Sequence, residues 1–407
     1  MKEQYFKYEA GMQKWLSKNL IDSEGMLELL NEEFEPYESS SLAEGKIIES
    51  YSWCINSLGL TETISEDENI SLKDGEILKP DFLLYAPETE SIVIVELKNS
   101  GNASRQAGTE LGAYTAEVKA YLPFISEGNV VHVIISPVWK TLLKRYVFNE
   151  IFWLGRKVIC LEPCTNDADE IRLKVVPPSE LIADDVEIRL SSEHLRGHQL
   201  CLYDWSWPEE GGTSILDKHI EQMKMAIAVM AQKGASLGSH GFAFLWKDFR
   251  SRSRAPYSIT VVYLSPFKAL ERFLHSPDDE VLENSKITDK FLSLASEYPS
   301  IGAGETDTHI TSFVCDLLKG VCSPTPEGFL EWKQLKSVMM ENSELLEFHG
   351  WGMFSDLMMD MVSREYQDGN QAVSYTDPNL GLKLLSELID PEYVYICLLY
   401  TSPSPRD

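Results

Sequence analysis

Several features that would define other protein classes are missing from this sequence. No apolar stretch approaches the roughly 20 residues that a membrane-spanning helix needs, and residues 1–7 lack the apolar core of a signal peptide. The seven cysteines are irregularly spaced, so they do not form a disulfide framework. No Gly-x-x-x-x-Gly-Lys loop is present, which argues against an internal motor domain. We therefore expect a cytoplasmic protein with no membrane segment.

Positive charge is also scarce. The chain has 36 Lys and Arg residues against 64 Asp and Glu residues, a formal net charge of −28. Because nucleic-acid-binding surfaces are generally basic, this total disfavours a broad DNA-binding surface, although it allows a local patch. Two stretches are locally basic, and each could follow a phosphate backbone or be a solvated face. The first contains Lys140, Lys144, Arg145, Arg156 and Lys157, and the second contains Lys247, Arg250, Arg252 and Arg254.

What the sequence does contain is the composition of an ordinary globular protein. With 407 residues, of which 43% are hydrophobic and 25% charged, the chain is long enough for two or three domains. We expect an acidic helical segment at 1–40, an α/β core at 41–165 and an α+β, mainly helical region of unknown role at 166–396. Within that last region, the pattern from about 267 to 387 is mainly helical.

The last eleven residues, 397–407, differ in character from the rest. They read as the in-frame translation of a transposase-based sequencing adaptor. We therefore expect them to be non-native and exclude them from fold reasoning. On this interpretation Cys397 is not native, and the natural chain continues past Ile396.

Two short strings carry groups that could perform chemistry. The first is Lys79-Pro80-Asp81, and the second is Glu96-Leu97-Lys98 at the end of an apolar run over 91–95. Residues two apart in a strand share a face, so Glu96 and Lys98 point the same way. The intervening loop over 86–90 favours a hairpin between two strands. We therefore expect Asp81 to lie beside Glu96, although the two are fifteen residues apart in sequence.

Two carboxylates and an ammonium in one place are sufficient for metal-assisted phosphodiester hydrolysis. A divalent cation needs hard oxygen ligands, and the attacking water needs a group that orients or deprotonates it. We expect Asp81 and Glu96 to bind Mg²⁺, or Mn²⁺ in its place, and Lys98 to act on the water or the phosphate charge. The alternative is that Glu96 and Lys98 form an ordinary ion pair on the surface of a sheet.

These strings resemble the signature of the PD-(D/E)xK nuclease superfamily, which includes restriction endonucleases and the Mrr-type and RecB-type nucleases. The resemblance covers about residues 41–163, where the expected order of elements is helix, strands, helix, strand. It implies a restriction-endonuclease-like α/β core, with a central mixed sheet flanked by helices. It also implies that Asp81, Glu96 and Lys98 form the active site of an enzyme that cuts DNA.

The sequence upstream of the strings extends the resemblance. Residues 45–49 look like the start of the first core helix of Mrr-type members, in which a glutamate also reaches the metal. The resemblance assigns that role of third metal ligand to Glu49, with Glu44 as a substitute.

The sequence downstream agrees only in part. RecB-type members place a Gln-x-x-x-Tyr motif on the next helix, which we expect here at 104–121. In this chain Glu110 occupies the glutamine position before Tyr114, and Gln106 lies one turn earlier. Because positions i, i+4 and i+8 lie along one helix face, all three side chains could line the site.

Two functions remain open at this level. The first is a metal-dependent nuclease that hydrolyses DNA phosphodiester bonds in restriction or other defence, or in recombination and repair. The second is the same fold kept as a catalytically idle module that binds DNA or protein. DNA is the expected partner; a protein could bind the region 166–396, and a dimer is plausible. In that region, strands expected at 241–249 and 258–264 would form a basic hairpin that touches DNA through Arg250, Arg252 and Arg254.

Overall fold

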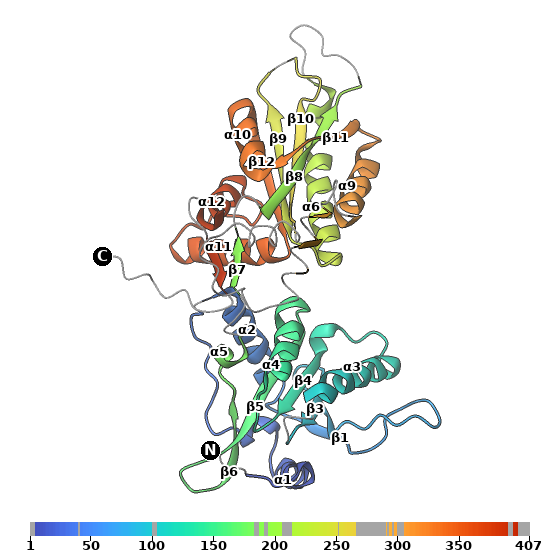
Figure 1. The fold of residues 1–407 in the computed structure, drawn as a ribbon, viewed down its shortest axis with the longest axis vertical. Coiled ribbons are helices and arrows are strands. Elements are labelled where there is room, and N and C mark those ends of the chain that lie inside the picture. Colours follow the sequence, from blue (N-terminus) through green and yellow to red (C-terminus); the bar gives the residue numbers. More distant parts are fainter. Residues whose placement is uncertain are drawn as a thin grey trace, which may run out of the picture. The chain divides into compact units, whose positions relative to one another are not determined.

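The computed structural model describes most of the chain. The described residues are 5–39, 41–99, 104–182, 187–190, 194–205, 214–250, 252–265, 305–389 and 394–397, with a few between 290 and 298. They form two compact units, the first running to Ile188 and the second beginning at Arg189. Each unit has one main sheet with helices packed on it (Figure 1). In this described part, no helix is long and apolar enough to cross a membrane.

Unit 1 is built on a mixed six-stranded sheet in the order β1-β2-β3-β4-β5-β6. The strands are β1 (Glu62–Glu66), β2 (Phe82–Ala86), β3 (Ser91–Leu97), β4 (Val130–Ile135), β5 (Lys157–Thr165) and β6 (Ile171–Val175). β3, β4 and β5 are parallel to one another, and the other neighbours are antiparallel. β3 and β4 are buried along their whole length, which explains their continuous apolar sequences. The expected α/β unit with a central mixed sheet is confirmed, and β6 extends this sheet beyond residue 165.

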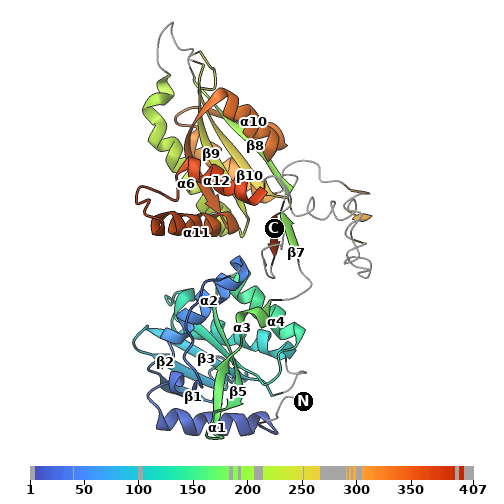
Figure 2. The ribbon, with the colours of Figure 1, turned by 90° about the vertical axis from the view of Figure 1, so that its left-hand side faces the viewer.

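Helices pack around the unit 1 sheet (Figure 2). They are α1 (Glu9–Asp22), α2 (Leu42–Asn56), α3 (Ser104–Tyr121), α4 (Thr141–Phe148) and α5 (Pro178–Leu181). α3 lies on the face of β4 that carries His132, because Thr115 Oγ1 is 2.7 Å from His132 Nε2. α2 packs along β5, where Ser50 Oγ accepts from the N–H of Val158 at 2.9 Å and donates to its carbonyl at 3.0 Å. These hydrogen bonds satisfy backbone groups in the part of β5 that has no partner in β6.

Unit 2 contains a five-stranded antiparallel sheet in the order β11-β8-β10-β9-β12. The strands are β8 (Leu195–Tyr203), β9 (Gly241–Asp248), β10 (Tyr257–Leu264), β11 (Ser323–Glu331) and β12 (Ser343–Trp351). The helices are α6 (Ile220–Ser236), α9 (Glu305–Leu318), α10 (Trp332–Asn342), α11 (Met353–Gln367) and α12 (Pro378–Ile389). β7 (Glu187–Leu190) and β13 (Val394–Cys397) pair as a separate two-stranded sheet. The other adaptor-like residues, 398–407, lie outside the described residues.

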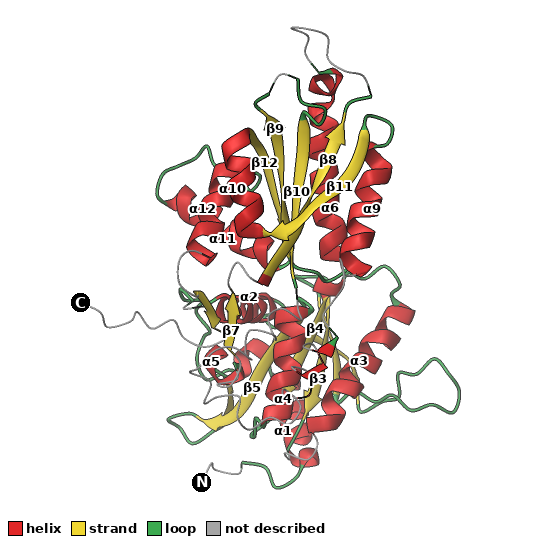
Figure 3. Cartoon of the chain, turned by 45° about the horizontal axis from the view of Figure 1, so that its top comes forward, coloured by secondary structure: helices red, strands yellow, loops and turns green. Residues whose placement is uncertain are grey.

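The two faces of the unit 2 sheet are packed differently (Figure 3). α6 and α9 cover an aliphatic face that includes Leu200, Leu245 and Ile259. On the opposite face, α10 contributes Trp332 to a cluster of aromatic rings that includes Phe242 and Phe244 of β9. Both faces are therefore buried cores of this unit.

The expected mainly helical pattern from about 267 to 387 holds in the described part of that range, which contains α9, α10, α11 and α12. It missed two strands there, β11 and β12. Both are edge strands of the sheet, and β11 is largely exposed along its length. An exposed edge strand does not need the apolar alternation by which a strand is recognised, so its sequence carried no strand signal.

Candidate active site

The β2–β3 hairpin brings Asp81 next to the end of β3. Phe82 pairs with Val95 in the antiparallel register, and Asp81 comes one residue earlier. Asp81 Oδ2 accepts a hydrogen bond from the backbone N–H of Leu97 at 2.7 Å. This bond fixes the carboxylate beside Glu96, while Oδ1 has no hydrogen-bond partner among the described residues. The hairpin expected from the sequence therefore exists, and it places the two carboxylates together.

Glu96 and Lys98 lie on the sheet face that α3 covers. Only 3% of Glu96 and 5% of Lys98 is exposed. The Lys98 ammonium contacts Glu96 Oε1 and donates to Glu110 Oε2, on α3, at 2.9 Å. The backbone N–H of Lys98 also donates to the carbonyl of Ile135 at 2.9 Å, which continues the pairing with β4. The pair is therefore a buried one held between a strand and a helix, and not a solvated surface pair.

Tyr114, one turn after Glu110 on α3, holds the segment that carries Asp81. Its hydroxyl donates to the carbonyl of Lys79 at 2.8 Å. Burial raises the pKa of Tyr114, and the neighbouring Glu96 and Glu110 charges raise it further. The structure thus brings Glu110 and Tyr114 to the site. The side chain of Gln106, the third helix candidate, lies outside the described residues.

The electrostatics of the site reflect an excess of carboxylates over cations. Burial raises the pKa of Asp81 to about 6, although the bond from Leu97 and the charge of Lys98 oppose the shift. Burial raises the pKa of Glu96 to about 9, opposed by Lys98 and assisted by Asp81 and Glu110. Burial alone would lower the pKa of Lys98, but Glu96 and Glu110 more than offset it and raise the pKa. All three groups therefore hold protons more tightly than usual, so the site attracts further positive charge.

The donor set fits a hard divalent cation with open coordination positions. Glu96 Oε2 is buried and has no hydrogen-bond partner. Across the described residues, no group of three or more His, Cys, Asp or Glu side chains is arranged to hold a metal ion. Mg²⁺ does not require such a cage, because it usually binds one or two carboxylates and completes its shell with water or substrate phosphate. Asp81 and Glu96 supply those two carboxylates.

Glu49 and Glu44 do not join this group. Glu49 is exposed on α2 and forms an ion pair with Lys157 at 3.1 Å. Lys157 pairs with Val131 at the start of β4, whereas Glu96 pairs with Ile134 near the end of β4. Glu49, the partner of Lys157, therefore lies at the end of the sheet opposite to Glu96.

The phase of α2 explains the placement of Glu49. Ile47, Ile48 and Tyr51 face the core, and Glu49 therefore points to solvent. The substitute, Glu44, is buried and accepts a hydrogen bond from the Tyr37 hydroxyl at 3.0 Å.

α4 packs closely against α3 beside the site, an approach that sequence reasoning did not find. A Cβ atom at Gly108 would lie 2.8 Å from the Tyr146 ring, so glycine is needed there. Burial raises the pKa of Tyr146, and Glu96 is among the charges that contribute, so this ring lies near the site. An aromatic residue on an amphipathic helix gives no sign in the sequence of which neighbour it meets.

The first basic stretch is partly neutralised. Arg156 forms an ion pair with Glu150 at 2.6 Å, and Lys157 is paired with Glu49. Lys140 is exposed just before α4, and Lys144 is half-buried one turn later. Lys144 and Arg145 lie directly before Tyr146 on α4. This helix follows β4, whose last residue, Ile135, accepts a hydrogen bond from the backbone N–H of Lys98. Lys140, Lys144 and Arg145 therefore follow β4 at the end of the sheet where Lys98 lies. The second stretch lies in unit 2, where Arg250, Arg252 and Arg254 are on the β9–β10 hairpin.

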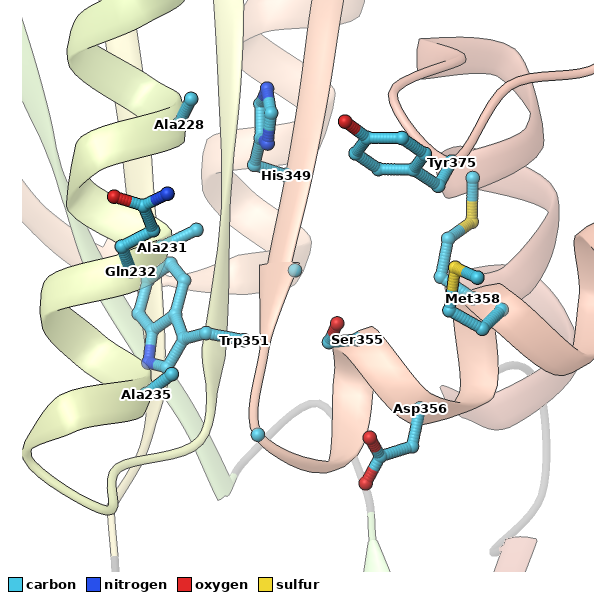
Figure 4. A pocket seen from close by; sticks show the side chains of 13 residues that line it. Ala228, Ala231, Gln232, Ala235, His349, Trp351, Ser355, Asp356, Met358 and Tyr375 are labelled. Carbon is cyan, nitrogen blue, oxygen red and sulfur yellow. The ribbon is translucent and has the colours of Figure 1, made fainter. Parts of the chain in front are cut away.

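Unit 2 contains a separate pocket of about 390 Å³ that sequence reasoning did not identify (Figure 4). Ala228, Ala231 and Ala235 of α6 form one wall, and Ser355 of α11 lies opposite. The ring of His349, on β12, is 6.3 Å from that of Tyr375, and burial lowers the pKa of His349. These residues come from four separate segments, so no local motif announces the pocket.

Comparison with known proteins adds no further assignment. No protein-family model, curated protein or solved structure matches the chain.

Proposed function

We propose that this chain is a metal-dependent nuclease that hydrolyses DNA phosphodiester bonds, in defence against foreign DNA or in recombination and repair. The observation that carries the proposal is the cluster of half-buried Asp81 with buried Glu96 and Lys98, in which Glu96 Oε2 has no partner among the described residues. Burying a carboxylate oxygen without a hydrogen-bond partner is costly, so a site of this kind is generally kept for a purpose.

The roles follow from the contacts of each residue. Asp81 and Glu96 would hold Mg²⁺ or Mn²⁺ through their carboxylate oxygens. The bound ion would supply positive charge to the scissile phosphate and make a nearby water more acidic. Lys98 stays protonated at neutral pH, because its two carboxylate partners raise its pKa. Its ammonium can therefore donate to a phosphate oxygen or orient the attacking water.

The helix α3 keeps this group in position. Glu110 accepts from Lys98 and fixes where the ammonium lies, while Tyr114 holds the backbone just before Asp81. Catalytic groups held in this way lose little freedom when substrate binds, which favours a fast chemical step.

The test is cleavage of linear, circular, single-stranded and branched DNA in the presence of Mg²⁺. We expect wild type to cut at least one of these, and Asp81→Asn and Glu96→Gln to lose the activity. Glu127→Gln, which changes an exposed carboxylate of the same unit, is the matched control and should cut as wild type does. Asp81→Asn cutting at the wild-type rate would contradict the proposal.

Metal binding is measured separately, by titrating Mn²⁺ and following its electron paramagnetic resonance. Wild type should bind the ion and Glu96→Gln should bind it much more weakly. If wild type binds Mn²⁺ and DNA but cuts none of the four substrates, the idle-module alternative is favoured.

A further inference from the structure

A groove of about 760 Å³ lies at one end of the unit 2 sheet, against the β9–β10 hairpin and the end of α10. Its floor contains Gln199, Cys201 and Tyr203, alternate residues of β8 that share one sheet face. Ser258 of β10 pairs with Cys201 and also lines the groove. The remaining lining residues include the hairpin arginines and Met339 of α10. The groove is therefore a hollow with a polar floor.

The hairpin places three arginines along this groove. Arg250, Arg252 and Arg254 occupy every second position, and all three are exposed. Among the described lining residues the acidic one is Asp248, whose carboxylate bonds the Arg250 guanidinium at 2.7 Å and its backbone N–H at 2.8 Å. In a chain with a net charge of −28, three exposed arginines along one groove are a local concentration of basic residues.

The hairpin is held in place by backbone hydrogen bonds. The N–H of Asp204 donates to the carbonyl of Arg254 at 3.1 Å, and the N–H of Phe249 donates to the carbonyl of Asn342 at 3.0 Å. The same two segments carry exposed aromatic residues that are not among the residues lining the groove. Trp205 follows Asp204 directly and is 66% exposed, and Phe249 is 65% exposed. Large exposed aromatic rings beside basic residues are the arrangement that binds unpaired bases by stacking.

The floor of the groove also contains a polar atom without a partner. Gln199 is 8% exposed, and its Nε2 donates to Thr260 Oγ1 at 2.6 Å. Its Oε1 is buried and has no hydrogen-bond partner. An acceptor left unpaired in this way is unfavourable, and an N–H group of a ligand that enters the groove would satisfy it.

We infer that this groove binds a short stretch of single-stranded nucleic acid. The arginines would contact phosphates, while Trp205 and Phe249 would stack on bases. A single strand is favoured over a duplex because the flat faces of bases are free for stacking only when the bases are unpaired. The inference rests on the proposed function for the class of polymer, and it adds a binding surface in a unit that lacks the catalytic cluster.

The test uses the full chain and a fluorescein-labelled 12-nucleotide thymidine strand, with anisotropy measured in EDTA so that no cutting occurs. Arg252→Glu/Arg254→Glu should weaken binding at least about tenfold. It should also reduce the slope of log affinity against log salt by roughly 0.7 for each lost phosphate contact. The matched control, Lys233→Glu/Lys333→Glu, makes the same charge change on α6 and at the far end of α10, and should change affinity less than about threefold.

Trp205→Ala tests the stacking contribution independently of charge. We expect it to weaken binding at least about fivefold while leaving the salt slope unchanged. A uridine strand of the same length distinguishes RNA from DNA, and a 12-base-pair duplex should bind more weakly than either strand.

Equal losses in the arginine and lysine variants would overturn the inference, and so would tighter binding of the duplex. Circular dichroism verifies that each variant is folded. Because binding is measured without metal, its failure is distinguishable from failure of the nuclease proposal, which rests on cleavage and on Mn²⁺ binding at Asp81 and Glu96.

Discussion

The two units place their charged residues in opposite environments, buried in unit 1 and exposed in unit 2. In unit 1, Glu96 and Lys98 are buried at the end of a strand, and their pKa values are shifted by burial and by each other. In unit 2, Arg250 and its neighbours are exposed on a hairpin. Chemistry needs groups with fixed positions and altered proton affinity, whereas recognition of a polymer needs accessible charges. Under the two proposals, unit 1 would cut the polymer and unit 2 would hold it.

The units also share a feature. Each sheet contains a buried histidine whose Nε2 lies against a threonine from the covering helix. His132 is 2.7 Å from Thr115 in unit 1, and His198 is 3.2 Å from Thr311 in unit 2. In both cases burial lowers the histidine pKa to about 4. Each unit therefore contains one buried histidine that resists protonation.

The largest effect is expected from Lys98→Met. Removing the ammonium leaves Asp81, Glu96 and Glu110 without a buried cation, so we expect cleavage to fall at least about 1,000-fold, equivalent to roughly 4 kcal/mol. Binding of the single strand should be unchanged, because the groove lies in the other unit. Lys247→Met, which removes a paired lysine of unit 2, is the control for cleavage. Loss of strand binding in Lys98→Met would show that the two roles are not divided between the units.

The next effect is acid destabilisation of both cores. A histidine whose folded pKa is below its unfolded value contributes stability that is present above about pH 6.5 and is lost as pH falls toward 4. From the lowered values of His132 and His198, we expect each histidine to cost its unit about 2–3 kcal/mol by pH 4.5. In unit 1 the raised pKa values of Asp81 and Glu96 act in the opposite direction, so the net acid loss should be smaller there than in unit 2.

Urea unfolding of the full chain at pH 7 and pH 4.5 measures this loss. His132→Leu should reduce the acid sensitivity of one transition and His198→Leu that of the other. If both variants retain the wild-type dependence on pH, the buried histidines do not account for the acid sensitivity of either unit.

Local signals explain how much of the fold and site could be predicted. β2, β3 and the pairing of Asp81 with Glu96 depend on residues close in sequence, so apolar runs and a short loop were sufficient. Glu49 was misplaced because two residues on one helix can face opposite sides, and only the phase set by its core contacts decides between them. The unit 2 groove joins residues from 199 to 343, and such a site becomes visible only when the sheet order is known.

A smaller effect is expected from Tyr114→Phe. The change removes the hydroxyl that bonds the carbonyl of Lys79 and keeps the ring, so stability should fall by about 1 kcal/mol. Cleavage should fall roughly tenfold, because the segment carrying Asp81 loses one of its supports. Tyr121→Phe is a matched control on the same helix, since its hydroxyl bonds the carbonyl of Ile70 at 3.0 Å. It should cost similar stability without loss of cleavage; equal activity losses would mean that Tyr114 acts only through stability.

The smallest effect is expected from Glu49→Gln, which tests whether Glu49 takes part in the metal site of unit 1. Glu49 is 71% exposed and forms an ion pair with Lys157. Glu96 is level with Ile134 of β4 and Cys160 of β5, and Lys157 lies three residues before Cys160. Three residues of strand span about 10 Å, so the backbone of the lysine that pairs with Glu49 is well separated from the level of Glu96. Cleavage and Mn²⁺ affinity should therefore stay within about twofold of wild type, and stability within ~0.5 kcal/mol. A large loss of Mn²⁺ affinity would mean that α2 approaches the carboxylates when metal binds, and the site would then extend across the sheet.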